Sequence, residues 1–199
     1  MKSSLYVVAL SAFLMLPTAV SAQFSDSYNF LKAVRDRTKD GNKAIDMMSK
    51  PGSVIIDTKD ITTGESALHI VTRERDVAWI NFLLSRGARV DIRDAQGNTP
   101  LMIATQIRFI EGASAFIKRR AQVDLANSGG ETPLMRAVQQ RDPAMVRLLL
   151  NAGANPDRVD SMAGLSARDY AKRDTRAVAI LKIIEEPRTK AAPVSGPKL

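Results

Sequence analysis

The sequence lacks the residues and motifs that most enzymes and metal proteins need. It contains no cysteine and a single histidine, His69, among its 199 residues. A zinc site or a cysteine–histidine nucleophile is therefore excluded. There is also no G-x-x-x-x-G-K-[ST] or G-x-G-x-x-G phosphate-binding motif and no G-x-S-x-G nucleophile elbow. We expect a protein that is not an enzyme and that binds no metal and no cofactor.

Acidic residues are the minority among the charged ones. The sequence has 21 Asp and Glu against 29 Lys and Arg, which gives a net charge of +8 and a pI near 10.0. An excess of positive charge favours acidic partners or anionic surfaces. It would also suit nucleic acid in the cytosol. The signal sequence described next argues against that compartment, so we expect no nucleic-acid partner.

The main apolar run is too short for a membrane span, which needs about 20 residues. This run, at 5–16, follows Lys2 and precedes Pro17 and the small residues V-S-A at 20–22. The order is typical of a secretory signal peptide, residues 1–22, with cleavage after Ala22. The alternative is an uncleaved N-terminal anchor. Without cysteine or an N-glycosylation sequon, the chain fits a bacterial periplasm better than a eukaryotic secretory route. We therefore expect a periplasmic or secreted protein.

What the sequence does contain is one short pattern at a fixed spacing. The stretches GESALHIVTRERD, GNTPLMIATQIRF and GETPLMRAVQQRD are close copies, and they begin at Gly64, Gly97 and Gly130. A weaker copy begins at Gly164. The glycines lie 33, 33 and 34 residues apart, and each is followed two residues later by Ser or Thr. Self-similarity at a period of about 20 to 50 residues indicates a solenoid of stacked repeats.

Each recurring feature of the pattern has a local cause. Glycine suits a turn that needs a positive φ. The Ser or Thr can cap a helix by accepting an unpaired backbone N–H of its first turn. Proline costs no hydrogen bond at the first helical position. The pairs Thr99-Pro100 and Thr132-Pro133 therefore each predict the start of a short helix.

A second helix is predicted after the first in each copy. Apolar runs indicate it at 79–84, 113–117 and 145–150. Gly87 and Gly153 follow the first and last runs and suit a left-handed helix end. In the middle copy the corresponding residue is Arg120, which would cost roughly 1 kcal/mol in that conformation. Gly112 also falls inside the middle helix, at a cost of up to about 1 kcal/mol against alanine. We expect this repeat to be the loosest, through drift or because the site adjusts to a partner.

This unit of turn, helix, helix and loop resembles the ankyrin repeat. The family pattern T-P-L-H-x-A is matched by T-P-L-M-I-A at 99–104, by T-P-L-M-R-A at 132–137 and more loosely by S-A-L-H-I-V at 66–71. The stretches LLSRGARVD and LLNAGANPD, at 83–91 and 149–157, are similar to the end of the family's second helix. The resemblance covers about 61–186. It implies an all-α solenoid of stacked helix-turn-helix units with hairpin-like loops.

The resemblance divides the chain into segments. We expect the signal peptide at 1–22, a degenerate N-capping repeat at 23–60, ankyrin repeats at 61–186 and a disordered tail at 187–199. The individual repeats run at about 61–93, 94–126, 127–159 and, as a C-capping unit, 160–186. The end units are expected to differ from the others because one of their faces meets water.

Residues with chemistry of their own have plain structural explanations. His69 stands in the T-P-L-H slot, where we expect its ring to bond to nearby backbone or to the adjacent loop. A calcium site is the less favoured alternative for the loop aspartates, because no EF-hand spacing occurs. We expect these residues to cap turns: Asp57, Asp60, Asp91 and Asp94.

Two further groups have equally plain explanations. Met102 and Met135 lie 33 residues apart and are expected to pack between repeats, although Met also suits adaptable binding surfaces. Lys118, Arg119 and Arg120 end a predicted helix, where cations complement the helix dipole. Neither group therefore requires a ligand.

The resemblance also implies where a partner would bind. Ankyrin arrays generally bind other proteins through their loop tips and the inner face of their first helices. Carried over to this sequence, the loop positions are Arg93, Asp94, Gln96, Asn98, Asn127, Ser128, Glu131, Asp160, Ser161 and Met162. Four further residues fall at one repeat position and would form a ladder on the inner face: Arg73, Gln106, Gln139 and Arg173.

Together these observations predict an exported protein–protein interaction module, a monomer that docks on or stabilises another envelope or secreted protein with an acidic surface. The alternative is an electrostatic binder of anionic envelope material, such as lipid head groups on a membrane surface or an acidic polymer. Steep salt dependence would distinguish the alternative from the first hypothesis. An enzyme with an unrecognised site is the least favoured reading, and loss of turnover in His69→Ala would locate it.

Overall fold

The computed structural model describes residues 18–49 and 55–186, and these form short helices joined by turns and loops. The helices are α1 (Thr18–Arg35), α2 (Arg37–Ser49), η1 (Ile55–Asp57), α3 (Ala67–Arg73), α4 (Val77–Ser85), α5 (Pro100–Gln106), α6 (Ile110–Lys118), α7 (Pro133–Gln139), α8 (Pro143–Asn151), α9 (Ala167–Arg173) and α10 (Val178–Glu185). The predicted tail at 187–199 and most of the predicted signal peptide lie outside the described residues.

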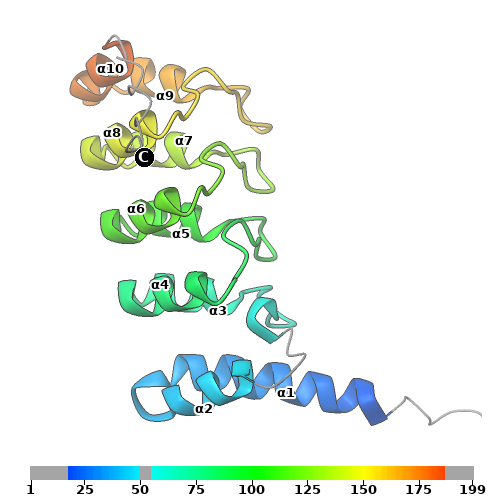
Figure 1. Cartoon of the computed structure of the whole chain (residues 1–199). Coiled ribbons are helices and arrows are strands. Elements are labelled where there is room, and N and C mark those ends of the chain that lie inside the picture. Colours follow the sequence, from blue (N-terminus) through cyan, green and yellow to red (C-terminus); the bar gives the residue numbers. More distant parts are fainter. Residues whose placement is uncertain (1–17, 50–54, 187–199) are drawn as a thin grey trace, which may run out of the picture.

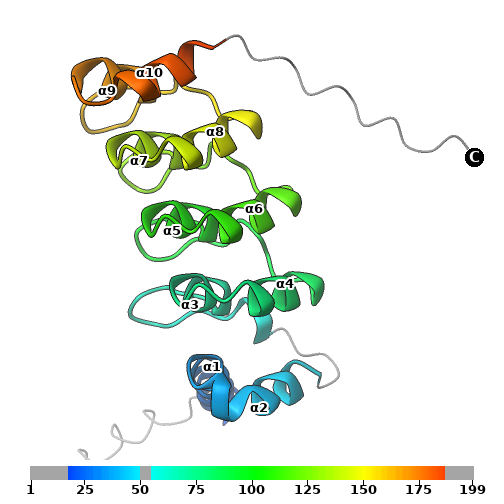
Figure 2. The same cartoon turned by 90° about the vertical axis from the view of Figure 1, so that its left-hand side faces the viewer.

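The helices stack as antiparallel pairs. Figures 1 and 2 show α3, α5, α7 and α9 in one column and α4, α6, α8 and α10 in a second. The loops between successive pairs project from the stack on one side, beside the first column (Figure 1). The predicted all-α repeat solenoid is confirmed.

The helix starts follow the Ser/Thr pattern. The Oγ1 of Thr99 accepts the backbone N–H of Met102 at 3.2 Å, and that of Thr132 accepts the N–H of Met135 at 3.3 Å. In both cases a proline is the first helical residue. Both predicted helix starts are confirmed, because the hydroxyl satisfies a donor that the first turn leaves unpaired.

The ends of the second helices are left-handed, as predicted. Gly87 follows α4 with a φ of 91°, and Gly153 follows α8 with a φ of 94°. Arg120, at the same position after α6, keeps the turn with a φ of 62°. This repeat therefore carries a side chain in a conformation that glycine adopts at no steric cost.

The core lies between the stacked helices. Leu101 and Leu134, in the first turns of α5 and α7, are fully buried. Met102 and Met135, next to them, are also fully buried, so they offer no binding surface. Each repeat therefore covers the apolar face of its neighbour, which is why a solenoid is stable only as an array.

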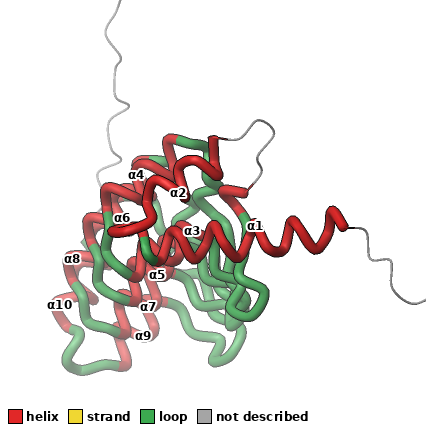
Figure 3. Tube along the Cα trace, turned by 90° about the horizontal axis from the view of Figure 1, so that it is seen from below, coloured by secondary structure: helices red, strands yellow, loops and turns green. Residues whose placement is uncertain are grey.

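The first helix is longer than the others. Helix α1 has 18 residues, against 7 in each of α3, α5, α7 and α9. Figures 1 and 3 show its N-terminal part projecting beyond the stack on the side of the loops. Its C-terminal half is anchored, because Phe30, Leu31 and Val34 are buried in the core. In the described segments, no helix combines the length and the hydropathy that a bilayer span requires.

Candidate functional site

The loops between helix pairs are tight hairpins organised by one acceptor side chain each. The Oδ1 of Asp60 accepts the N–H groups of Thr62 and Thr63 at 2.9 and 3.1 Å, and that of Asp94 accepts those of Gln96 and Asn98 at 2.9 and 2.8 Å. The equivalent residues in the next two hairpins, Asn127 and Asp160, accept N–H groups of their own hairpins in the same way. The prediction that Asp60 and Asp94 cap turns is confirmed.

The hairpins are also joined to one another through their backbones. The N–H of Ala95 donates to the carbonyl of Thr63 at 3.0 Å, and that of Ser128 donates to Gln96 at 2.9 Å. A third bond joins Ser161 to Gly129 at 3.2 Å. These bonds hold the hairpin tips in one continuous row, as Figure 1 shows.

Glycine is required where neighbouring hairpins approach most closely. Gly64 and Gly130 have φ values of 68° and 77°. A Cβ at Gly130 would lie 2.4 Å from the backbone nitrogen of Ser161, and one at Gly64 would lie 2.5 Å from that of Ala95. A side chain at either position would therefore force the row apart as well as strain the turn.

A second set of aspartates links each repeat to the next. Asp57 accepts the backbone N–H of Arg89 at 2.9 Å, and Asp91 accepts that of Gln122 at 3.1 Å. Asp124 accepts the N–H of Asn155 at 3.0 Å. Among the described residues no group of His, Asp and Glu is arranged to hold a metal ion. These contacts give the loop aspartates a structural role.

His69 also has a structural role, as predicted. The ring is fully buried, its Nδ1 accepts the N–H of Ser66 at 3.2 Å, and its Nε2 lies 3.0 Å from the carbonyl oxygen of Asn98. Burial lowers its pKa, which favours the neutral ring with the proton on Nε2. Nδ1 therefore caps the start of α3 itself, and Nε2 ties α3 to the next hairpin.

The structure divides the predicted loop contacts into buried and exposed residues. The side chains of Asp94, Asn98 and Asp160 are buried, and hydrogen bonds within their own loops account for their polarity. Asn127 and Glu131 are half-buried. The exposed members of the predicted set are Arg93, Gln96, Ser128, Ser161 and Met162. The buried members therefore shape the loops, and only the exposed ones present their side chains to the surroundings.

The predicted ladder of four residues occupies one structural position. Arg73, Gln106, Gln139 and Arg173 are the last residues of α3, α5, α7 and α9. Two of them are held by the hairpin that precedes their helix, since Arg73 pairs with Glu65 at 2.5 Å and Gln106 donates to Asn98 at 3.5 Å. Their shared position is confirmed, and their contact with a partner stays a prediction.

The repeat geometry agrees with the comparison with known protein families. The family model described as ankyrin repeats (3 copies) matches residues 68–160. The match covers just under half of the chain, and the stacked helix pairs of the structure agree with an ankyrin-repeat fold over this segment. Ankyrin repeats are in general protein–protein interaction modules and are not typically catalytic.

Electrostatics reinforce the hairpins at both ends of the ankyrin array. The N–H groups of Thr63 and Thr62 hold the pKa of Asp60 at about 2. In the last hairpin the hydroxyl of Tyr170 donates to Asp160 at 2.5 Å, which lowers the pKa of that carboxyl and raises the pKa of the tyrosine. Both carboxylates are therefore charged at neutral pH and keep their hairpins closed.

A ladder of arginines between the ankyrin repeats was not predicted. Arg75, Arg108 and Arg141 connect the two helices of successive pairs, with positive φ values of 57°, 54° and 52°. Arg108 donates to the carbonyl of Gln140 at 2.7 Å, Arg141 pairs with Asp174 at 2.7 Å, and Arg75 donates to a carbonyl of the next repeat. Each arginine clamps its repeat to the following one. Its recurrence every 33 residues was the signal in the sequence.

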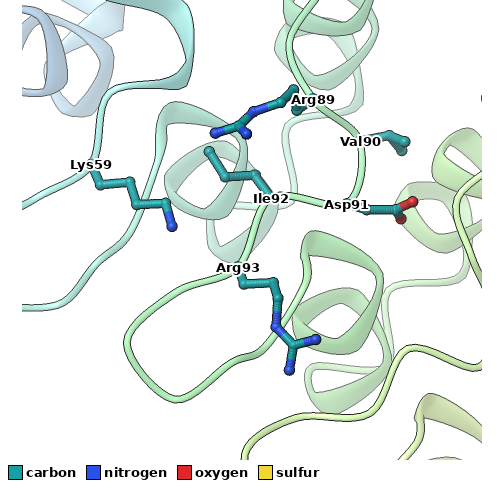
Figure 4. Close-up of a pocket in the computed structure, with 6 residues that line it drawn as sticks. All are labelled: Lys59, Arg89, Val90, Asp91, Ile92 and Arg93. Carbon is teal, nitrogen blue, oxygen red and sulfur yellow. The ribbon is translucent and has the colours of Figure 1, made fainter.

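A basic pocket lies on the arms that lead into the first two hairpins. It has a volume of about 480 Å³ and is lined by Lys59, Arg89, Val90, Asp91, Ile92 and Arg93. Figure 4 shows the ends of Lys59 and Arg89 and the side chain of Ile92 close to one another, with Asp91 turned the other way. Of this lining only Arg93 was predicted as a contact residue.

A second basic surface lies at the ends of the second helices. Lys118 is the last residue of α6, and Arg119 and Arg120 follow it, as predicted. Arg86, at the equivalent end of α4, stacks on Phe82 at 5.1 Å from the ring centroid. In the described parts of the chain no ion pair joins these four exposed cations to an acid. The corresponding end of α8 carries Asn151 and Ala152 instead.

Proposed function

We propose that this protein is an exported protein–protein interaction module that docks on or stabilises another envelope or secreted protein. The binding surface consists of the hairpin tips together with the ends of the first helices. The observation that carries the proposal is the contrast between a repeated framework and varied tips. The framework bonds recur from hairpin to hairpin, whereas the tips carry different side chains at equivalent places.

The tip residues differ in size and polarity along the row. Ile61 and Met162, at its two ends, are 88% and 87% exposed, which is unusual for large apolar side chains. Gln96 and Ser128, between them, are exposed and polar. A row with apolar ends and a polar middle can distinguish one partner from others by side-chain complementarity.

An acidic partner is supported by the charge of this surface. Arg93 and Arg173 are exposed, one on a hairpin arm and one at the end of α9. The whole chain carries a net charge of +8, of which removal of the segment 1–22 would subtract only Lys2. Complementary charge speeds association and selects among partners more than it adds affinity.

Export is supported by the sequence at 1–22 and is compatible with the packing of α1. Cleavage after Ala22 would remove the first residues of the helix. The buried anchors Phe30, Leu31 and Val34 lie well beyond that point. We expect the protein produced in a Gram-negative host to begin at Gln23 in the exported fraction, which intact mass measurement would test. An unprocessed chain there would favour the uncleaved anchor.

The test of the interaction is a pull-down from the exported fraction with tagged protein, at low and at high salt. The informative variant changes Arg93, Gln96 and Gln139 together to alanine. Its matched control changes one cation and two polar residues on the second helices, Lys182, Ser85 and Asn151, to alanine. One or two proteins retained at high salt, lost with the first variant and kept with the control, would support specific docking. Equal loss with both variants would contradict it.

The second candidate is an electrostatic binder of anionic envelope material, and the four cations at the ends of α4 and α6 favour it. Because no acid within residues 18–49 and 55–186 pairs with Arg86, Lys118, Arg119 or Arg120, these cations present positive charge on two adjacent repeats. This function predicts flotation with vesicles that contain an anionic phospholipid, abolished by salt. Changing the four cations to glutamine would abolish it as well, and unchanged flotation would rule this candidate out.

A further inference from the structure

The pocket between Lys59 and Arg93 has unused hydrogen-bonding capacity. Arg89 donates through Nε to Asp57 at 3.0 Å, and no described residue accepts a hydrogen bond from either of its terminal nitrogens. Arg93 uses Nη2 in its bond to the carbonyl of Ala126 at 2.6 Å, and its Nη1 has no hydrogen-bond partner in the part of the chain that the structure describes. Within the described residues Lys59 forms no ion pair and is exposed. These cations therefore retain donors that solvent or a ligand must satisfy.

The acids around the pocket are already engaged. The carboxylate of Asp91, the one acid in the lining, accepts the N–H of Gln122 at 3.1 Å. Asp57 binds both the backbone and the guanidinium of Arg89. The lining thus carries three cations against one carboxylate, which is turned toward the next repeat (Figure 4).

The apolar residue between the cations, Ile92, offers almost no surface to a ligand. Ile92 is 4% exposed, and Figure 4 shows its side chain near the ends of Lys59 and Arg89. The free donors of the cations suit a carboxylate, and that of a glutamate or aspartate side chain within a peptide could accept from them in the pocket.

We propose that this pocket holds an acidic side chain of the protein partner, with Lys59 and Arg89 as the residues that recognise its carboxylate. This assignment rests on the proposed function in so far as the carboxylate belongs to a protein. It extends the contact surface from the hairpin tips to the arms at their base, and it adds two residues that the sequence did not single out.

The test is a titration of the whole isotope-labelled chain with an acetylated and amidated tetraglutamate peptide, followed through backbone amide chemical shifts. We expect shift changes at Lys59 and at 89–93, and none with the matched tetraglutamine peptide. Lys59→Gln should weaken the apparent affinity about fivefold, as expected for one exposed charge pair. Lys118→Gln, which removes the same charge outside the pocket, should change it less than about twofold.

Three results would overturn the assignment. Equal loss in Lys59→Gln and Lys118→Gln would mean that general positive charge binds the peptide. Shift changes spread over all cationic surfaces would mean the same. Inorganic phosphate that bound the pocket more tightly than tetraglutamate would make it a small-anion site. Lys59→Gln should keep the native spectrum, and Arg89→Gln provides a second variant if it does not.

The titration and the pull-down fail independently. A peptide response at 89–93 together with no specific partner in the pull-down would contradict the proposed function and leave a carboxylate-binding pocket. A specific partner whose capture survives Lys59→Gln and Arg89→Gln would support docking through the hairpin tips and overturn the role of the pocket. Each outcome therefore decides one of the two proposals.

Discussion

The α5–α6 repeat and the α7–α8 repeat that follows it begin their second helices in different ways. In α8 the carboxylate of Asp142 accepts the N–H of Met145 at 3.0 Å and so caps the first turn. In α6 the same position is taken by Phe109, whose side chain makes no capping bond. Three residues later α8 has the buried Met145, and α6 has Gly112.

In the two repeats the large buried side chain stands at different positions of the second helix, before its first residue in α6 and in its first turn in α8. Phe109 is 4% exposed, and a Cβ on Gly112 would lie 2.4 Å from its ring. The glycine is thus the residue that makes room for the phenylalanine. The Asp142–Met145 pair of α8 and the Phe109–Gly112 pair of α6 are therefore alternative ways to begin the second helix. Close packing means that one pair can replace the other only when both residues change together.

The largest effect is expected from breaking one pair at a time. Phe109→Asp should cost about 3 kcal/mol, because it removes a buried ring. Gly112→Met should cost about 2 kcal/mol through overlap with the ring. The double variant, which copies the arrangement in α8, should be more stable than the sum of the single effects by about 2 kcal/mol. Urea denaturation measures all three, and additive costs would contradict the paired arrangement.

The first helices of the same two repeats should respond alike, because their caps are alike. Thr99→Ala and Thr132→Ala should each lower the free energy of unfolding by about 1 kcal/mol, since each leaves a helix-start N–H unpaired. Ser128→Ala, on an exposed hairpin tip, is the control and should change it by less than about 0.5 kcal/mol. Unchanged thermal unfolding in both threonine variants would contradict the caps.

The residues that follow the second helices, Arg120 after α6 and Gly153 after α8, should make a smaller difference to stability. Arg120→Gly should raise the free energy of unfolding by about 0.5 to 1 kcal/mol, because it relieves a side chain at positive φ. Gly153→Ala, the converse change after α8, should lower it. Arg119→Gly, next to the turn at a negative φ of −91°, should not stabilise the protein. Stabilisation by both glycine substitutions would point to an effect unrelated to the turn.

The comparison extends to the hairpins, where the smallest effect at neutral pH is expected. Asp60→Asn should lower the free energy of unfolding at pH 7 by about 0.5 kcal/mol or less, because the amide keeps the acceptor that Asn127 provides in its own hairpin and loses only the exposed ion pair with Arg35. Below pH 4 the two proteins should diverge. The folded-state pKa of Asp60 is about 2, below the usual 3.8, so its charged form stabilises the wild type above pH 4.

This contribution is lost from the wild type as the pH falls from about 4 to 2, when the carboxylate takes up a proton. The amide of the variant does not titrate, so its acid unfolding should be less steep over that range. Thermal unfolding measured at several pH values would show this. Parallel curves for the two proteins would contradict the role of the carboxylate.

Much of the array could be predicted because its signals are local. A hydroxyl before proline, a glycine at a left-handed turn and an aspartate in a hairpin act on backbone atoms within four residues. Thr99 and Thr132 as caps, Gly87 and Gly153 as helix ends and Asp60 as a turn cap follow from that. His69 could be assigned to a structural role because no second histidine or cysteine exists to share a site.

Contacts between repeats were harder to predict, because they join residues about 33 positions apart. The clamp made by Arg108 depends on a carbonyl in the next helix pair. The exposure of the proposed contact residues also depends on how loops stack: Asp94 and Asp160 are polar loop residues, yet neighbouring backbone buries them. No pattern within one repeat distinguishes them from the exposed Gln96.

The sequence by itself determined the period, the helix starts and the solenoid, because these depend on backbone hydrogen bonds made within one repeat. The tertiary structure alone decided that Gly112 accommodates Phe109, that arginines clamp successive repeats and that Lys59 meets Arg89 at one pocket. Each of those depends on a distance between segments that only stacking brings together. The order of residues determines the local backbone geometry, whereas packing between repeats decides which side chains remain exposed.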